Sequence, residues 1–211
     1  MATRLTREQS KAATRDKLLD AARKVFAARG FHGASVEEIA AAAGFSTGAL
    51  YSNFGGKEDL FLVLMDRELS RHASELNAAV ANRETVSEKA LGGADYWMRI
   101  IERERELLLL FMEFWAYGVR DPDIRPHVAA HFAETRRMLT CLIADSAREL
   151  GIDLAIPAEH VAIAIDAIAD GIMRQKLADP DAIPDDLLGT ILSRLFTSAM
   201  QPAHTGTHSE R

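Results

Sequence analysis

The sequence predicts an all-α protein of about nine helices. Apolar residues recur at three- and four-residue spacing along almost the whole chain, which is the period of an amphipathic helix. The alternation of apolar and polar residues that marks a half-buried strand is almost absent. Glycine and proline are few, 13 and 6 among 211 residues, and no low-complexity tract is present, as expected of a globular chain.

Local signals mark the ends of three N-terminal helices. The first is expected from about residue 11 to residue 29, with Gly30 at the position of a left-handed C-cap. The second opens at Ser35, and Glu38 three residues later completes a capping box, in which hydroxyl and carboxylate each satisfy a free backbone N–H. Ser46 can cap a third, short helix near residues 47–54.

The later helices show apolar faces between polar or glycine-containing breaks. Gly92-Gly93 marks a kink or a close packing point in the fifth helix, and the alternating charges at 102–106 predict a solvated connection. These helices are expected from about Lys57, over 86–103, 107–117 and 127–150, and from about Pro157 and Pro184, with a polar loop within 81–89 and a disordered tail at 204–211.

Composition limits the class of protein. The longest apolar run, 107–112, is far shorter than the about 20 residues that a membrane span needs. The first 15 residues are polar and lack the apolar core of a secretory signal. A single cysteine, Cys141, excludes an internal disulfide and fits a reducing compartment. We therefore expect a cytoplasmic protein that has no membrane partner.

The net charge of −6 argues at first against a nucleic-acid partner, but the charge is unevenly distributed. Residues 1–29 carry eight Lys and Arg against three acidic residues, whereas residues 61–211 carry 16 basic against 24 acidic residues. A polyanion responds to the face presented to it rather than to the charge of the whole chain. The basic N-terminal part is compatible with phosphate binding, although a solvated helix face would give the same pattern.

Residues 35–54 have the form of a helix-turn-helix, in which a first helix braces the DNA backbone and a second reads base edges. The two helices must cross closely, and Ala40 gives the contact point little bulk. Gly44 permits the positive φ of the turn, and Leu50 would anchor the second helix in the core. This motif is the main functional signal in the sequence.

The second helix of the motif would present small and polar side chains to double-stranded DNA. Asn53 can pair bidentately with adenine, and Thr or Ala methyls can contact a thymine methyl. Tyr51 and Lys57 are better suited to phosphate, and Lys57 also stands near a helix N-terminus, where N–H groups favour anions. The predicted DNA-binding residues are Ser35, Ser46, Thr47, Gly48, Ala49, Tyr51, Ser52, Asn53 and Lys57, with Arg4 and Arg7 from the N-terminal arm.

Two other motifs suggest different chemistry. GFSTG at 44–48 satisfies G-x-S-x-G, the nucleophile elbow of serine hydrolases, but that motif needs a strand before the serine and a βαβ pattern, and residues 37–43 predict a helix. The enzyme is therefore the weaker alternative. His127 and His131 can share a helix face, but two ligands do not define a metal site. We expect no metal and no cofactor.

Several short stretches form a recognisable set: Thr14-Arg15, AARKVFAARG at 21–30, Ser35-Val36, Ile39-Ala40, Ala43-Gly44 and GALYSNFGGKEDLF at 48–61. With them, residues 12–72 resemble the DNA-binding domain of the TetR family of bacterial transcriptional regulators. Asn53 departs from the family pattern, in which His often precedes the Phe. The segment FMEFWAYGVRDPDIRP at 111–126 and DGI at 170–172 are similar to the betaine-regulator, or BetI-like, subgroup.

The resemblance implies a helix-turn-helix DNA-binding domain at 12–72 and an effector-binding and dimerisation domain at 73–203. It implies a homodimer that binds a palindromic operator, represses transcription and is released by a small apolar or amphipathic effector. A DNA-binding regulator that needs no ligand is the alternative reading.

Candidates for the ligand and the dimer contacts come from the apolar patterns. Aromatic and thioether residues in the fifth to seventh helices could line a cavity, although a plain core would use the same residues. Glu113 lies alone in an apolar run, so it either faces solvent or favours a cationic or hydrogen-bonding ligand. The predicted pocket residues are Trp97, Phe111, Met112, Glu113, Trp115, His131 and Phe132. The predicted dimer residues are Ile165, Ile168, Ile172, Leu187, Ile191 and Leu195, on the wide apolar stripes of the last two helices. A core within one subunit is the alternative for these stripes.

Overall fold

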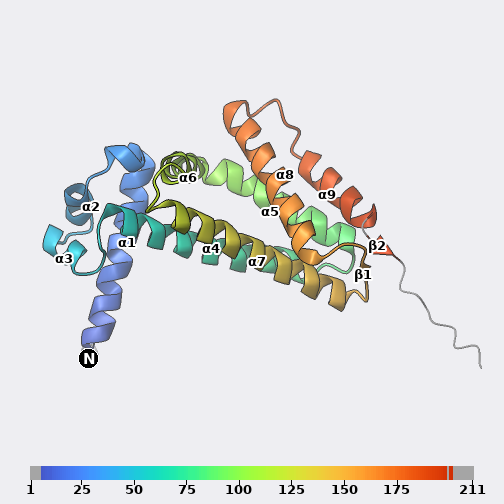
Figure 1. Ribbon diagram of the computed structural model, residues 1–211, viewed down its shortest axis with the longest axis horizontal. Helices are drawn as coiled ribbons and strands as arrows, with labels where there is room; N and C mark the ends of the chain where they lie inside the picture. Colours follow the sequence, from blue (N-terminus) through green and yellow to red (C-terminus); the bar gives the residue numbers. More distant parts are fainter. Residues whose placement is uncertain (1–5, 199, 202–211) are drawn as a thin grey trace, which may run out of the picture. The chain divides into compact units, whose positions relative to one another are not determined.

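The computed structural model describes residues 6–198 and 200–201, and over these residues the protein is almost entirely helical (Figure 1). The all-α prediction is confirmed. The elements are α1 (Arg7–Gly33), α2 (Val36–Ala42), α3 (Thr47–Tyr51), α4 (Lys57–Ala81), α5 (Val86–Arg103), α6 (Arg105–Gly118), α7 (Arg125–Glu149), β1 (Asp153–Leu154), α8 (Ala158–Ala178), α9 (Leu187–Ser198) and β2 (Met200–Gln201). Arg4 and the tail 204–211 lie outside the described residues.

The described residues form two units according to their contacts. The head unit contains the residues up to Arg71 together with Glu104–Ala129, and therefore α1–α3, the first part of α4, α6 and the start of α7. The body unit contains His72–Arg103 and the residues from Ala130 onward. Helix α6 thus belongs to the head unit by its contacts, although the sequence analysis assigned it to the second domain; the functional domain bounds 12–72 and 73–203 stay a prediction.

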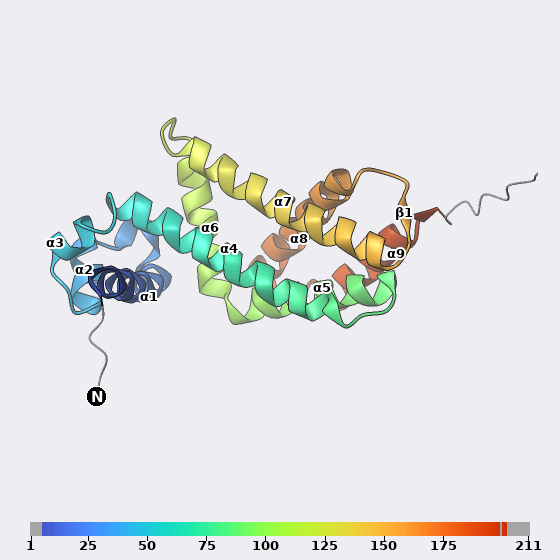
Figure 2. The same ribbon diagram turned by 90° about the horizontal axis from the view of Figure 1, so that it is seen from below.

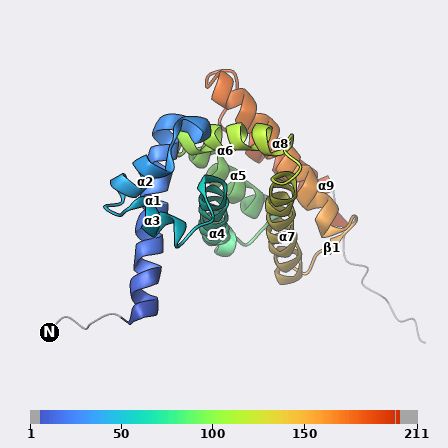
Figure 3. The ribbon, with the colours of Figure 1, turned by 60° about the vertical axis from the view of Figure 1, so that its left-hand side comes forward.

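An aromatic cluster forms the core of the head unit. Phe26 and Phe31 from α1, Phe61 from α4 and Phe114 from α6 are each at most 2% exposed. Phe61 and Phe114 stack with ring centres 4.2 Å apart, and Phe31 meets Phe114 edge to face at 4.9 Å. Helix α2 packs against α1, and α3 packs against α2 (Figure 3); Ile39 of α2 and Leu50 of α3 are fully buried.

Helix α1 is longer than predicted at both ends. It begins at Arg7, because Thr6 and Gln9 form a full capping box that the sequence analysis did not consider. Gly30 has φ 72° and ψ 172°, so it interrupts the helix as expected, but a further turn follows it up to Gly33. At α2 only half of the predicted capping box is present: Ser35 Oγ accepts from the Glu38 N–H at 3.1 Å, and the Glu38 carboxylate accepts from Arg29 instead.

The predicted solvated connection at 102–106 is wrong at its centre. Glu104 is only 6% exposed, because its carboxylate accepts from Arg71 Nη2 at 2.7 Å and from Arg23 Nη2 at 3.4 Å. Arg71 also donates to the buried Glu68, so two carboxylates share one guanidinium. A buried carboxylate is stable only with such partners, and these come from parts of the chain distant in sequence.

Close packing of α5 with its neighbours organises the body unit. A Cβ on Gly92 would approach the Ala79 carbonyl oxygen to 2.9 Å, and one on Gly189 would approach Leu91 Cδ2 to 2.9 Å. Helix α5 is continuous, so Gly92 marks close packing rather than a kink. Helices α5 and α9 are joined further by Ser87 Oγ and Ser193 Oγ, 2.6 Å apart.

The body unit also contains the short antiparallel pair of β1 and β2, in which Asp153 pairs with Gln201 and Leu154 with Met200. Two-residue strands carry no periodicity that a sequence pattern can reveal. Among the described residues, no helix has the combination of length and apolarity that crossing a membrane requires.

Candidate DNA interface

The turn between α2 and α3 is built as the sequence predicts. Gly44 has φ 76°, a conformation that residues with a Cβ rarely adopt. The Gly44 N–H donates to the Ala41 carbonyl at 3.0 Å and the Phe45 N–H to the Ala40 carbonyl at 2.9 Å, so two carbonyls of the last turn of α2 have backbone donors. Ser46 then caps α3, its Oγ accepting from the Ala49 N–H at 3.2 Å. Because a helix and not a strand precedes Ser46, this serine lacks the setting of a nucleophile elbow.

Helix α3 is five residues long, shorter than the expected segment to Phe54, and Leu50 is its one buried residue. The opposite face is open. Tyr51 is 56% exposed, although tyrosine rings are usually more covered. The other predicted DNA-binding residues that the structure leaves exposed are Arg7, Ser35, Ser46, Gly48 and Ser52, and those left partly exposed are Thr47 and Ala49.

Asn53 does not present its amide to the outside as predicted. Its Nδ2 donates to the Ala49 carbonyl at 2.8 Å, and its Oδ1 is buried with no hydrogen-bond partner among the described residues. The reason is local: carbonyls at the end of a short helix lack intrahelical donors, and a nearby asparagine amide can supply one. In this conformation Asn53 completes the end of α3 and does not offer a bidentate edge to adenine.

Lys57 has a structural contact in addition to its predicted phosphate role. Its Nζ donates to the Ala34 carbonyl at 3.2 Å and lies 4.7 Å from the ring centre of Phe31. The first residue of α4 is thereby joined to the link between α1 and α2. A lysine ammonium has three donors, so a phosphate contact by Lys57 stays a prediction.

The structure adds Arg15, which the sequence analysis did not place at the interface. Its Nη1 donates to the Asn53 carbonyl at 2.6 Å, and its guanidinium lies 4.3 Å from the centre of the Phe54 ring. Arg15 therefore joins α1 to the end of α3. Arg15 and Asn53 are 38 residues apart in the chain, so no local pattern predicts their contact. The one sequence signal is that Thr14-Arg15 is among the residues that resemble the TetR family.

Glu113 also has a role that the sequence did not reveal. Its carboxylate accepts from the Phe31 N–H at 3.0 Å and from the His32 N–H at 3.1 Å, directly after the interruption of α1 at Gly30. A Cβ at Gly30 would lie 2.7 Å from Glu113 Oε2. Glu113 is partly exposed, and its carboxylate satisfies backbone donors of the head unit, a structural role that the sequence analysis did not include.

The seven predicted pocket residues are divided between the two units. Phe111, Met112, Glu113 and Trp115 belong to the head unit, in which Trp115 is 38% exposed. Trp97, His131 and Phe132 belong to the body unit, in which Trp97 Nε1 donates to the Ala169 carbonyl at 3.3 Å. Their role in ligand binding stays a prediction.

The body unit contains a groove of about 420 Å³ that shares none of these seven residues. The groove lies between three helices: the end of α4, the start of α5, and α7. Figure 2 shows the course of these helices. We call this groove the α4–α7 groove, and it is lined by Asn77, Val80, Ala81, Lys89, Glu134, Arg137, Met138, Cys141, Leu142, Asp145, Ser146 and Glu149.

Two carboxyl groups on α8 have altered acidity. Burial, together with the nearby charge of Asp170, raises the pKa of Asp166 to about 6, although Arg136 acts in the opposite direction. Burial also raises the pKa of Asp170, which pairs with Arg174 one turn later.

The predicted dimer residues differ in how much surface they leave for a partner. Ile172 is 6% exposed and belongs to the core of its own subunit, so it has almost no area to offer. Ile165 packs against the cluster of Ile143, Val161 and Ala162. Leu195 is 45% exposed, and Ile168, Leu187 and Ile191 are partly exposed.

Comparison with known proteins agrees with this geometry. Residues 18–64 match the family described as bacterial regulatory proteins, tetR family, and residues 99–200 match the BetI-type transcriptional repressor, C-terminal family. The HTH-type transcriptional repressor AcnR of Corynebacterium efficiens is 26% identical over 189 residues, which are 90% of this chain and 94% of that protein.

Solved structures share the fold. A TetR-family transcriptional regulator from Mesorhizobium loti has a TM-score of 0.75 at 18% identity, with 94% of this chain and 100% of that chain covered. The transcriptional regulator FadR from Bacillus subtilis, in complex with stearoyl-CoA, has a TM-score of 0.68 at 17% identity, with 88% and 99% covered. With a capped helix-turn-helix in its head and both of its parts matched, the chain belongs to the TetR family of DNA-binding transcriptional regulators, and its C-terminal part is of the BetI type.

Proposed function

We propose that this regulator binds a palindromic operator as a homodimer, represses transcription in the cytoplasm, and is released by a small effector bound in the body unit. The observation that carries the proposal is the open face of α3. A short helix capped by Ser46 and anchored by Leu50 exposes Tyr51 with small neighbours on each side. A helix of this kind fits the major groove, with its small residues against base edges and the tyrosine hydroxyl against phosphate.

The dimer contact is proposed on α8 and α9. Both helices carry apolar side chains that the subunit leaves uncovered, with Ile163 at 46% and Leu195 at 45% exposure. Apolar surface on neighbouring helices is typical of a subunit contact. A two-fold axis there would allow two α3 helices to enter successive major grooves, about 34–36 Å apart.

Release requires that an effector bind a DNA-incompetent state more tightly than the DNA-binding state. A difference of a few kcal/mol changes operator occupancy by orders of magnitude. The structural relative FadR from Bacillus subtilis, solved with stearoyl-CoA, supports ligand control in proteins of this fold.

A gel shift with the DNA upstream of the chain's own gene tests the DNA-binding part. Wild-type protein should shift this DNA with a strong dependence on salt, since phosphate contacts release counterions. Tyr51→Ala should abolish the shift while helicity and oligomeric state stay unchanged. Leu109→Ala, an exposed apolar position on α6, serves as the matched control and should bind normally. Wild-type affinity in Tyr51→Ala would show that α3 does not read the operator.

A further inference from the structure

We propose that the α4–α7 groove binds a small amphipathic carboxylate, whose anionic end replaces Glu149 as the partner of Lys89. The proposal concerns the effector part of the proposed function and names the chemical class of the ligand. It can be tested on the protein alone, without DNA.

Lys89 gives the groove a fixed positive charge. Its side chain is only 9% exposed, and its Nζ donates to Glu149 Oε2 at 3.0 Å and to the Val80 carbonyl at 3.4 Å. A buried ammonium needs a counter-ion, and with three donors it can bind a further acceptor beyond these two. Lys89 is therefore the anchor to which an anion entering the groove would bind.

Glu149, the present partner of Lys89, is easily displaced. It is the last residue of α7, and its side chain is 64% exposed. A carboxylate at a helix end regains most of its hydration when it turns away, so little free energy opposes its exchange for a carboxylate from a ligand. The ammonium stays in place during this exchange, because Lys89 is buried and its Nζ also donates to the Val80 carbonyl of α4.

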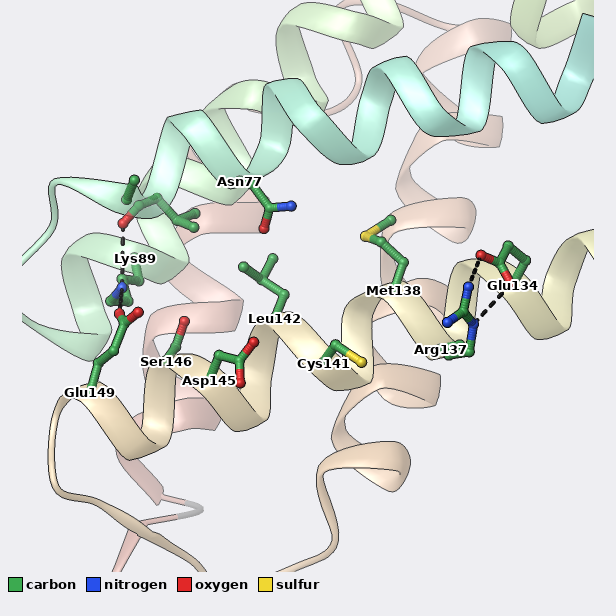
Figure 4. A pocket seen from close by; sticks show the side chains of 12 residues that line it. Asn77, Lys89, Glu134, Arg137, Met138, Cys141, Leu142, Asp145, Ser146 and Glu149 are labelled. Carbon is green, nitrogen blue, oxygen red and sulfur yellow. Dashed lines mark hydrogen bonds and ion pairs between the residues drawn. The ribbon is translucent and has the colours of Figure 1, made fainter.

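The rest of the groove suits an apolar chain. From the Lys89 end, Leu142 and then Met138 follow along α7, facing Asn77 of α4 (Figure 4). Val80 and Ala81 add further apolar surface. Met138 and Glu149 are eleven residues apart in α7, about 16 Å at the rise of an α-helix, and the groove volume falls in the range of small-molecule sites.

The lining has three acidic and two basic residues, but its one buried charge is positive, and this charge favours an anion over a cation. Each acidic residue of the lining already has a basic partner: Glu134 pairs with Arg137, Asp145 with Arg148, and Glu149 with Lys89. Glu134 and Asp145 are well hydrated, with side chains 48% and 57% exposed, so they would add little to the binding of a cation. The deeply placed charge is the ammonium of Lys89.

Isothermal titration of the full chain with decanoate and with its neutral counterpart decanol tests the site. Wild-type protein should bind decanoate more tightly than decanol. Lys89→Met keeps the length of the stem and removes the charge, so decanoate affinity should fall about tenfold or more while decanol affinity changes little. Arg99→Met removes an exposed charge of the same helix, α5, outside the groove and is the control, with less than about a twofold expected change.

Glu149→Gln gives an opposite and independent prediction. Without the competing carboxylate, decanoate should bind several-fold more tightly, and this variant keeps the proposal testable if Lys89→Met fails to fold. Equal binding of decanoate and decanol, or a decanoate affinity unchanged in both variants, would overturn the proposal. Binding that follows Lys89 but leaves the gel shift intact would confirm the site and refute only its role as the effector site.

Discussion

Removing the Glu113 carboxylate should destabilise the head unit by a predictable amount. Two backbone donors point at this carboxylate, a partly buried one at Phe31 and an exposed one at His32. The exposed N–H can turn to water, but the partly buried one loses its acceptor, and a hydrogen bond to a charged group contributes about 1.5–3 kcal/mol. We expect Glu113→Ala to lower the free energy of unfolding by about 2–3 kcal/mol, and Glu113→Gln by about 1 kcal/mol.

Urea denaturation followed by circular dichroism measures this difference, at one fixed protein concentration because subunit association contributes to stability. Glu102→Ala removes an exposed carboxylate of α5 and should change the stability by less than about 0.5 kcal/mol. A loss below about 0.5 kcal/mol in Glu113→Ala as well would refute the reasoning, since it would show that the two amide contacts do not contribute.

A double-mutant cycle with Gly30→Ala separates the two parts of this contact. The glycine conformation itself is costly for alanine, about 1–3 kcal/mol, and the added Cβ would also lie 2.7 Å from Glu113 Oε2. In the double variant with both Gly30→Ala and Glu113→Ala, the steric conflict between the added Cβ and the carboxylate disappears. The two losses should therefore add to more than the loss of the double variant.

Two further outcomes follow from contacts within the units. Arg15→Ala should weaken operator binding at every salt concentration, because the Asn53 carbonyl at the end of α3 loses its hydrogen bond to Arg15. Lys17→Ala removes the same charge at an exposed position of α1 and should lower the affinity only slightly. Equal losses of affinity for the two variants in a gel shift would contradict this role of Arg15. For Asp166, the folded pKa of about 6 lies above the ordinary aspartate pKa of 3.8, so the protonated group favours the fold below pH 4 and this stability is lost as the pH rises through 6. Asp166→Asn should remove that decline in urea titrations at pH 4 and pH 7, and an unchanged pH dependence would show that burial and Asp170 do not act on this carboxyl group.

Features that depend on neighbours in sequence were predictable. The caps at Ser35 and Ser46 and the positive φ of Gly44 follow from bonds within a few residues, so their residue types alone indicate them. The location of the helix-turn-helix depends on these signals, so the sequence alone indicates it.

Features that depend on distant partners were not predictable. The sequence around Glu104 predicts a surface charge, because its partners Arg71 and Arg23 are distant in the chain. The sequence around Glu113 predicts a residue facing solvent or ligand, because the amides of Phe31 and His32 that it binds are also distant in the chain. A sequence pattern gives the face of a helix but not which element covers it. The α4–α7 groove was not predicted from the sequence for the same reason: it lies between helices whose contacts are determined by the fold and not by a local pattern.

The inward orientation of the Asn53 amide has a consequence for the sequence specificity of DNA binding by this regulator. With that amide bonded to Ala49, the polar groups that α3 still exposes are hydroxyls, which donate or accept and so tolerate several bases. Discrimination would then depend on thymine methyl contacts and on how readily the DNA deforms. Operators of such a protein should be recognisable by their shape and spacing more than by a strict consensus, and single base changes should weaken binding gradually.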